Sequence, residues 1–223
     1  MKNKLIIALD FSRRRDALKI VDDLKELVET YKVGIQLFTS CGPKIVSEIK
    51  ERDANIFLDL KFLDIPNTVE KASEAVTALD VDFFDLHLSG GKEMLRSAIS
   101  GSERGARQLG KSRPRILGVT VLTSQTDGLD VLNLSIMAKE NGLDGVIASG
   151  LEATEIRKKL GKDFLILCPG IRPSWAKKND QKRIVTPEEA IKNGADYIIV
   201  GRPITAAKNP REATERILEE IKK

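Results

Sequence analysis

Residues 58–68 read Leu-Asp-Leu-Lys-Phe-Leu-Asp-Ile-Pro-Asn-Thr, and they continue the apolar run of residues 54–58. A short apolar run of this kind is typical of a buried strand. Side chains two residues apart in a strand point to the same face, so we expect Asp59 and Lys61 to project together. Asp64 follows where the strand becomes a loop, and Pro66-Asn67 is typical of the first turn of a helix. The stretch therefore predicts a strand, a charged loop and a helix in succession.

The charged residues of this stretch have two interpretations. Two carboxylates and an ammonium group at the end of an apolar strand are costly to bury unless they are paired. They could form a structural ion pair at the end of the strand, or they could belong to a reactive site. Both arrangements shift the pKa values of the residues involved, so the charges alone do not distinguish them. The rest of the chain has to decide between them.

The same alternation of apolar runs and amphipathic segments covers the whole chain of 223 residues. We expect strands at 4–9, 31–35, 54–61, 82–88, 115–122, 144–148, 164–168 and 196–200. Helices are expected at 16–28, 43–50, 68–79, 92–100, 129–141, 152–160, 187–193 and 211–221. Strands that alternate with helices imply a parallel sheet, and eight such units in one domain, residues 1–223, predict a compact (β/α)8 TIM barrel. A doubly wound open sheet is the alternative, but no Gly-x-Gly-x-x-Gly follows any expected strand.

Composition disfavours a nucleic-acid-binding protein, a cysteine-based zinc or redox site and a membrane protein. The 37 basic and 33 acidic residues are interspersed, and the net charge of +4 indicates a weak preference for anions rather than a nucleic-acid surface. Cys41 and Cys168 match no zinc or redox spacing, which favours a reducing cytoplasm. No signal peptide begins the sequence, and no apolar run approaches the roughly 18 residues of a membrane span.

Reactive side chains fall repeatedly at the ends of the expected strands, where barrel enzymes carry their chemistry. These residues are Asp10, Asp59, Lys61, Asp64, His87, Thr123, Arg172, Gly201 and Arg202, and Lys32 lies on the expected strand 31–35. A placement so regular favours a reactive site over a solitary ion pair.

The residues after the last two expected strands suit a phosphate. Loops in this position of a barrel often bind a phosphate. Glycine lets backbone N–H groups approach the anion, and arginine can donate two hydrogen bonds to it. Gly201 and Arg202 supply both groups, and Gln181 could add a neutral donor. The long polar loop 172–183 fits a lid over a bound anion, although a loop of this length can also serve only as a connection. Trp175 in the lid segment 173–180 could cover the closed loop or only anchor it.

Lys61 and His87 are the candidates for proton transfer. Neighbouring carboxylates favour the cationic form of Lys61, which suits a proton donor or an electrostatic anchor rather than a Schiff base. Charges about 4 Å apart at an effective dielectric near 20 interact by roughly 4 kcal/mol, so an array of such charges strongly favours one charge arrangement. His87 could act as a general base or as a hydrogen-bonded part of the scaffold.

Taken together, the motifs resemble the orotidine 5′-phosphate decarboxylase family, in its bacterial branch. The resemblance begins with Asp59-x-Lys61-x-x-Asp64-Ile-Pro-Asn-Thr68 and extends over nearly the whole chain. It includes Leu-Ile-Ile-Ala-Leu-Asp10, Tyr-Lys32-Val-Gly, His87-x-Ser-Gly-Gly, Val-Thr-Val-Leu-Thr123-Ser, Pro169-Gly-Ile-Arg172-Pro, Asp-Gln181-Lys-Arg and Gly201-Arg202-Pro. The Asp-x-Lys-x-x-Asp core also occurs in sugar-phosphate enzymes of the superfamily, whereas Ile-Pro-Asn-Thr is more specific.

The resemblance implies a role for each matching residue. Lys61 would protonate C6 of the pyrimidine of orotidine 5′-phosphate as CO2 leaves, in the final step of de novo UMP synthesis, with Asp59 beside the substrate carboxylate and Lys32 bridging Asp59 and the ribose. Asp64, Ile65 and Thr68 would reach the neighbouring site of a homodimer. The other implied substrate contacts come from Asp10, Thr123, Pro169, Arg172, Gln181, Gly201 and Arg202. The family needs no metal or organic cofactor.

Two rival functions stay open. A metal-dependent sugar-phosphate lyase or synthase would use the same Asp-x-Lys-x-x-Asp array and would require a divalent cation. A non-catalytic binder of a nucleotide or nucleic acid is suggested only by the pI near 9.0. It would bind without turnover, and a polyanion would bind with a steep dependence on salt.

Overall fold

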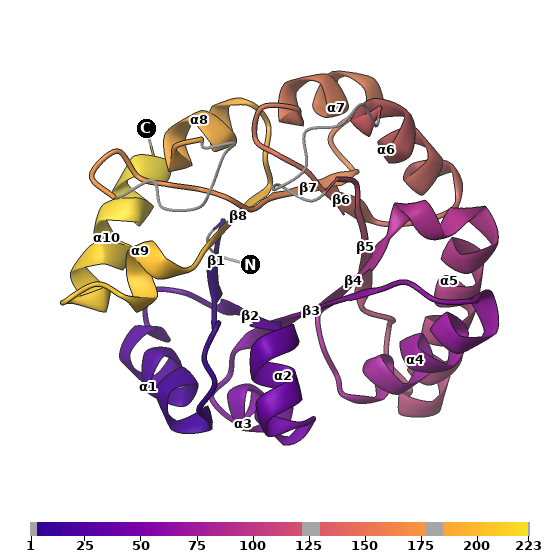
Figure 1. The fold of residues 1–223 in the computed structure, drawn as a ribbon, viewed down its shortest axis with the longest axis horizontal. Helices are drawn as coiled ribbons and strands as arrows, with labels where there is room; N and C mark the ends of the chain where they lie inside the picture. The colour runs from indigo at the N-terminus through magenta and orange to yellow at the C-terminus, as the bar shows by residue number, and fades with distance from the viewer. Residues whose placement is uncertain (1–3, 122–129, 177–184, 223) are drawn as a thin grey trace.

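A computed structural model describes residues 4–121, 130–176 and 185–222. Its strands are β1 (Leu5–Ala8), β2 (Thr30–Gly34), β3 (Asn55–Phe62), β4 (Phe83–His87), β5 (Arg115–Val119), β6 (Gly145–Ile147), β7 (Leu165–Cys168) and β8 (Tyr197–Val200). All neighbours pair in parallel, and β8 pairs with β1, which closes the barrel in sequence order. Figure 1 shows this ring of strands with the helices outside it. The predicted single-domain (β/α)8 TIM barrel is confirmed, and the open sheet is excluded.

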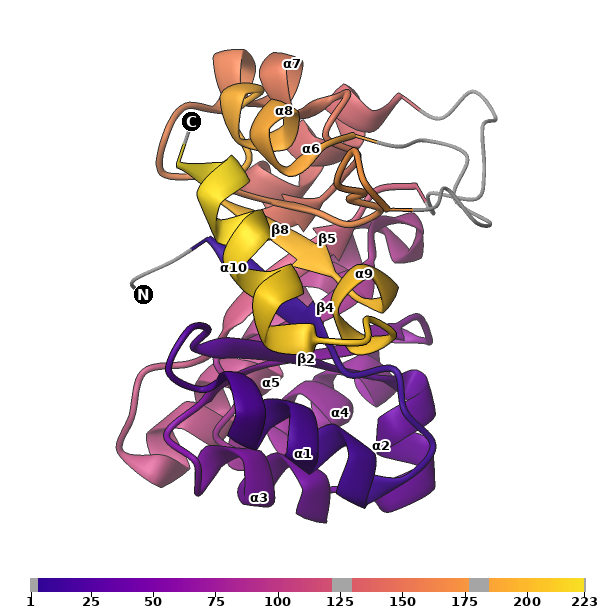
Figure 2. The ribbon, with the colours of Figure 1, turned by 90° about the vertical axis from the view of Figure 1, so that its left-hand side faces the viewer.

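The helices cover the outer face of the barrel (Figures 1 and 2). They are α1 (Arg14–Leu24), α2 (Ile35–Cys41), α3 (Lys44–Lys50), α4 (Pro66–Ala78), α5 (Gly91–Leu109), α6 (Val131–Glu140), α7 (Ala153–Leu160), α8 (Pro187–Lys192), α9 (Arg202–Thr205) and α10 (Pro210–Ile221), with a 3-10 turn at Leu88–Gly90. Pro66 opens α4 as predicted. Among the described residues, no helix is long and apolar enough to cross a membrane.

Buried apolar residues form two layers separated by the strands. Inside the barrel, one cluster comprises Ile6, Ala8, Phe57, Phe83, Leu117, Val119, Ile147, Leu167 and Ile199. The other cluster fills the space between strands and helices and includes Leu58, Phe84 and Leu86. Neighbouring residues of one strand therefore serve opposite layers, as the period of two requires. On β3 and β4 the inward positions beyond Phe57 and Phe83 carry Asp59 and Asp85, so the interior changes from apolar to charged towards the carboxyl ends.

The length of α5 differs from the sequence prediction. We expected a helix over 92–100. The helix instead continues to Leu109. A Cβ atom on Gly101 would collide with the carbonyl oxygen of Glu70, and one on Gly105 would lie 2.8 Å from that of Glu74. These glycines therefore let α5 pack directly against the backbone of α4, and tertiary packing outweighs their low helix propensity.

Smaller differences concern the other helices. The prediction for 16–28 was too long, because α1 ends at Leu24. Two short helices, α2 and α9, form where only strand ends and turns were expected. Both follow directly on the carboxyl end of a strand, and they flank the mouth of the barrel in Figure 1.

Three aspartates support the opposite, amino-terminal end of the barrel. The carboxylate of Asp82 accepts the N–H of Ile56 at 2.7 Å, Asp144 accepts that of Ile116 at 2.7 Å, and Asp196 accepts that of Ile166 at 2.8 Å. Each precedes β4, β6 or β8 and satisfies a backbone donor of the strand before it, while pairing with a basic side chain (Lys50, Arg113 or Arg157). Charged groups at this end of the barrel therefore have a structural role.

Candidate active site

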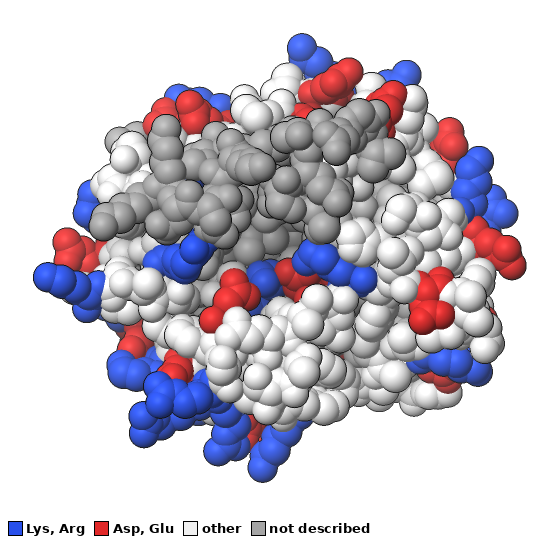
Figure 3. Space-filling view, in the orientation of Figure 1, with Lys and Arg blue, Asp and Glu red and all other residues white. Residues whose placement is uncertain are grey.

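A cavity opens at the carboxyl ends of the strands, where reactive residues were predicted. Its lining residues are Ala8, Asp10, Lys32, Asp59, Lys61, Val119, Val121, Ile147, Ala148, Pro169, Gly170, Arg172, Ile199, Gly201 and Arg202. Acidic and basic side chains meet near the centre of this face in Figure 3. The predicted residues Asp10, Lys32, Asp59, Lys61, Pro169, Arg172, Gly201 and Arg202 are therefore brought together in one place.

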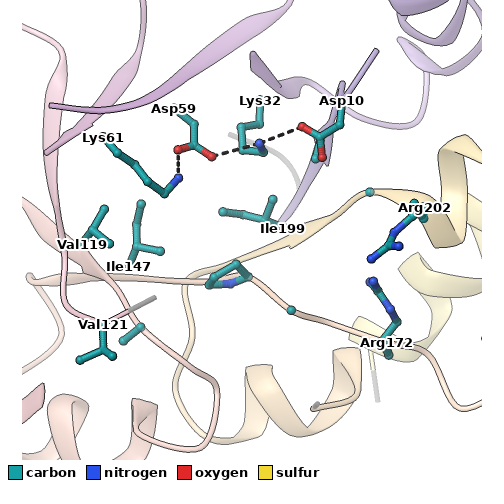
Figure 4. Close-up of a pocket in the computed structure, with 15 residues that line it drawn as sticks. Asp10, Lys32, Asp59, Lys61, Val119, Val121, Ile147, Arg172, Ile199 and Arg202 are labelled. Carbon is teal, nitrogen blue, oxygen red and sulfur yellow. Dashed lines mark hydrogen bonds and ion pairs between the residues drawn. The ribbon is translucent and has the colours of Figure 1, made fainter. Parts of the chain in front are cut away.

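Four of these side chains form a row of alternating charge along one wall (Figure 4). The Nζ atom of Lys32 lies 3.2 Å from Oδ1 of Asp10 and 3.0 Å from Oδ2 of Asp59. The other carboxylate oxygen of Asp59 pairs with Nζ of Lys61. Strands β1, β2 and β3 are neighbours in the sheet, which is why residues 10, 32 and 59–61 meet.

The row fixes the charge state of its central pair. Burial alone raises the pKa of Asp59, but the ammonium groups of Lys32 and Lys61 outweigh burial and hold that pKa below its ordinary value. Burial lowers the pKa of Lys32, and Asp59 and Asp10 more than reverse this effect, so the pKa of Lys32 is raised. Asp59 is therefore ionised and Lys32 protonated at neutral pH.

The backbone around Lys61 departs from a regular strand. Between the pairs Leu58–Phe84 and Phe62–Leu86, β3 advances by four residues and β4 by two, so β3 carries a bulge. Lys61 lies in the bulge with a φ of 53°, a conformation that side-chain-bearing residues rarely adopt. The prediction that Asp59 and Lys61 project together is confirmed by their contact, but regular strand alternation is not what achieves it.

Asp85 is the polar residue of the site that sequence reasoning missed. It lies on β4 beside the bulge, is 0% exposed, and accepts the backbone N–H of Lys61 at 2.8 Å. Its Oδ2 atom lies 3.7 Å from Nζ of Lys61. The available signal was an aspartate in the middle of the expected strand 82–88, two residues from Phe83 on the same face, where a charge is costly.

The far end of the cavity carries the positive charge expected for a phosphate site. In Figure 4 the guanidinium groups of Arg172 and Arg202 point towards one another, across the cavity from Lys61. Arg172 follows β7 and is buried, whereas Arg202 begins α9 and is exposed. Two converging guanidinium groups favour an anion between them.

Apolar side chains form most of the remaining wall and were not singled out from the sequence. In Figure 4 Val119 and Ile147 lie beside Lys61, and Ile199 lies between the charged row and the two arginines. They extend the apolar interior of the barrel up to the cavity. A flat apolar body with polar groups at both ends would fit such a wall.

Gly34 is a further residue that the sequence did not mark. A Cβ atom there would lie 2.9 Å from Nζ of Lys32 and 3.3 Å from Oδ1 of Asp10. The absence of a side chain therefore leaves room for this ion pair at the end of β2.

Several predicted residues lie outside the cavity lining. Asp64, Ile65 and Thr68 are exposed at the start of α4, and Oδ1 of Asp64 accepts the N–H of Ile65 at 2.7 Å. His87 ends β4, and its pKa is lowered by burial and by the Lys61 cation, against the opposing effect of Asp59. Thr123 and Gln181 lie outside the described residues.

Trp175 anchors the described part of the predicted lid segment. Its indole N–H donates to Oε1 of Glu220 at 3.1 Å, and the guanidinium carbon of Arg216 lies 4.3 Å from the centre of a Trp175 ring. Both partners belong to α10. Of the two roles considered for Trp175, the contacts therefore support anchoring.

Comparisons with known proteins agree with this geometry. The model of the "Orotidine 5'-phosphate decarboxylase / HUMPS family" matches residues 3–217. This chain belongs to that family. The orotidine 5'-phosphate decarboxylase of Syntrophomonas wolfei is 44% identical over 99% of this chain and 98% of its own length, and that of Nostoc sp. is 44% identical over 98% and 97%.

Solved structures of the decarboxylase family have the same fold. The crystal structure of orotidine 5'-phosphate decarboxylase from Lactobacillus acidophilus superposes with a TM-score of 0.85 at 36% identity, and the match covers 100% of both chains. That from Pyrococcus horikoshii has a TM-score of 0.81 at 29% identity, covering 98% of this chain and 99% of the other. The family resemblance expected from the motifs is therefore confirmed.

Proposed function

We propose that this chain decarboxylates orotidine 5′-phosphate to uridine 5′-phosphate, the final step of de novo pyrimidine nucleotide synthesis. One observation carries the proposal. A lysine ammonium group paired with a buried carboxylate faces a cavity with an apolar wall, and two arginines converge at the other end. This order of groups matches a substrate with a reacting carboxylate, a pyrimidine ring and a remote phosphate.

Lys61 is the proposed proton donor. Loss of CO2 leaves carbanion character at C6, and an ammonium group held beside that carbon stabilises the transition state before giving up its proton. The C6–carboxylate bond breaks, its electron pair stays on C6, and the proton of Lys61 forms the new C6–H bond. Asp59 holds Lys61 in place and faces the substrate carboxylate.

The remaining residues position the substrate. Lys32 pairs with both Asp59 and Asp10, and we assign Lys32 and Asp10 to the ribose hydroxyls. Arg172, Arg202 and Gly201 bind the phosphate, whose binding energy is realised far from the bond that breaks. Pro169 lines the pyrimidine end, and Thr123 and Gln181 stay predictions for the pyrimidine edge and the phosphate.

We propose further that the active unit is a homodimer. Ile35, Leu63 and Ile65 are large apolar side chains that are 55%, 55% and 66% exposed. In Figure 3 an area without charged side chains extends from the mouth of the barrel over α2 and towards α4. A second copy covering this area would bring its Asp64 and Thr68 to the rim of the cavity.

The reaction proposed here uses protein side chains only, without metal or organic cofactor. We place it in the cytoplasm, in keeping with free thiols at Cys41 and Cys168. The extent of the domain, residues 1–223, stays a prediction.

An ultraviolet assay in excess EDTA tests the proposal. Purified protein is mixed with orotidine 5′-phosphate, and the loss of substrate absorbance is followed with and without chelator. We expect turnover that EDTA does not change. No turnover on this substrate, together with magnesium-dependent activity on a sugar phosphate, would instead establish the lyase or synthase alternative.

A further inference from the structure

The side chain of Asp85, on the neighbouring strand β4, contacts the backbone of the bulge in β3. Oδ1 of Asp85 accepts the N–H of Lys61 at 2.8 Å, and this N–H belongs to the residue with the left-handed φ of 53°. A side-chain-bearing residue in this region costs of order 1–3 kcal/mol and persists only where its surroundings enforce it. Asp85 is therefore part of what fixes the backbone, and with it the direction, of Lys61.

The second oxygen of Asp85 has an unusual environment. Oδ2 is fully buried and accepts no hydrogen bond from any donor in the part of the chain that the structure describes. Asp59 and Asp85 both contact Nζ of Lys61, Asp85 through Oδ2 at 3.7 Å, and a hydrogen bond between the two carboxyl groups would satisfy this oxygen. Two ionised carboxylates cannot form such a bond, because it requires a proton on one of them.

Charge balance shows which carboxyl group holds the proton. Asp10 and Asp59 already match the two ammonium groups of Lys32 and Lys61. Asp59 is in direct contact with both lysines, whereas Oδ2 of Asp85 is 3.7 Å from Lys61 alone. A third negative charge in the most buried position would be unbalanced, so the proton belongs on Asp85.

The surroundings of Asp85 on its neighbouring strands support the same assignment. The charged groups that face it are Asp59 and Lys61 on β3, and His87 follows on its own strand. On β5 the residue opposite Asp85 is Leu117, and the inward positions Leu117 and Val119 are apolar. Burial and the Asp59 charge raise the pKa of Asp85 well above its ordinary value, against the opposing effect of Lys61.

We propose that Asp85 is a positioning residue of this active site, which as a neutral acid accepts the backbone N–H of Lys61 and donates its own proton to Asp59. It touches no substrate atom. It fixes the positions of Lys61, the proposed proton donor, and of its partner Asp59. Because Asp85 is neutral, it adds no further negative charge to the row. This inference rests on the proposed function for its kinetic consequences, but not for the protonation state itself.

Two substitutions separate the neutral acid from a carboxylate. Asp85→Asn keeps an acceptor for the Lys61 N–H and a donor for Asp59, so kcat should stay within about tenfold of wild type. Asp85→Ala removes both groups, and a misplacement of Lys61 by about 1 Å should lower kcat about 100-fold while KM changes little. Asp144→Asn is the matched control, because Asp144 also accepts a backbone N–H across strands but lies at the other end of the barrel.

An infrared measurement reports the proton directly. The carbonyl stretch of a protonated carboxylic acid should appear in the wild-type spectrum at neutral pH and be lost in Asp85→Asn but not in Asp144→Asn. Its absence from wild type would overturn the proposal, as would equal losses of kcat in Asp85→Asn and Asp85→Ala, or no loss in either. If wild type does not turn over orotidine 5′-phosphate, the proposed function fails, while the infrared result still decides the state of Asp85.

Discussion

Nζ of Lys32 lies 3.0 Å from Oδ2 of Asp59, and the two side chains are only 11% and 10% exposed. A pair so deeply buried is stabilising only while both partners are present. The desolvation cost of each ion is several kcal/mol, and its partner offsets that cost. The pair therefore couples the stability of the barrel to the integrity of the active site.

Replacing Lys32 by methionine should destabilise the protein by about 3–5 kcal/mol at pH 7, because it leaves Asp59 buried with less compensation. In wild type the pKa of Asp59 is lower in the folded protein than in the unfolded chain, where it is near 3.9, and this difference stabilises the fold. The stabilisation is present above the pKa of the unfolded chain and is lost as the pH falls through the pKa of the folded protein. In Lys32→Met the pKa of Asp59 should be higher, so the deficit shrinks as the pH is lowered. Denaturant unfolding of both proteins between pH 7 and pH 4 measures the difference, and a deficit that does not change with pH would contradict this account.

Lys61→Ala should lower kcat by at least about 10³-fold, because it removes both the proton and the cation beside the developing charge. The loss of stability should be smaller than in Lys32→Met, since the Lys61 side chain is 27% exposed and water can replace part of its pairing with Asp59. Steady-state kinetics and a thermal melt of the same preparation test both statements. Lys19→Ala, on the exposed face of α1, serves as the control. A variant with near-normal kcat would exclude Lys61 as the proton donor.

Arg202→Ala should raise KM more than it lowers kcat, if phosphate binding is largely uniform between ground and transition states. Loss of a charge-assisted hydrogen bond corresponds to about 1.5–3 kcal/mol, or roughly 10- to 150-fold in kcat/KM. Inorganic phosphate should inhibit wild type more strongly than the variant. Arg211→Ala is the control, because this exposed arginine of α10 does not line the cavity. Equal phosphate inhibition of wild type and Arg202→Ala would place the anion elsewhere.

Asp85→Asn should stabilise the protein relative to wild type, and increasingly so as the pH rises. An acid with a raised folded pKa contributes stability that is present below its unfolded pKa and is lost as pH rises through the folded pKa. The difference should therefore grow above about pH 4 by up to about 1.4 kcal/mol per pH unit and level off at the folded pKa of Asp85. Urea unfolding at several pH values measures it, and parallel curves would show that Asp85 is ionised in the fold.

Ile65→Asp should weaken the proposed dimer, because it places a charge in an area that association would desolvate. Sedimentation at several protein concentrations should show a shift towards monomer, with kcat falling as dimers dissociate. Leu109→Asp, at an exposed apolar position at the end of α5, is the control and should leave the oligomeric state unchanged. A wild-type protein that sediments as an active monomer would exclude the dimer.

Much of the site followed from the sequence because strand ends can be recognised in it. Asp10, Asp59, Arg172 and Arg202 each stand at or beside the end of an apolar run, and parallel strands bring such ends to one rim. Asp85 escaped notice because it lies within its run and not at the end. Nothing in the local pattern shows that β3 bulges opposite it.

By itself, the sequence determined the number and order of the strands and the face on which the charged residues gather. Hydrophobic periodicity marks the strands and helices, and their alternation implies a parallel sheet, which is compatible with few folds. The closeness of α5 to α4 and the bulge that turns Lys61 were decided by tertiary structure alone. So was the position of Asp85 beneath that bulge. These features depend on contacts between residues that are distant in sequence, and such contacts can override local preference: Gly101 sits within a helix, and Lys61 adopts a left-handed backbone.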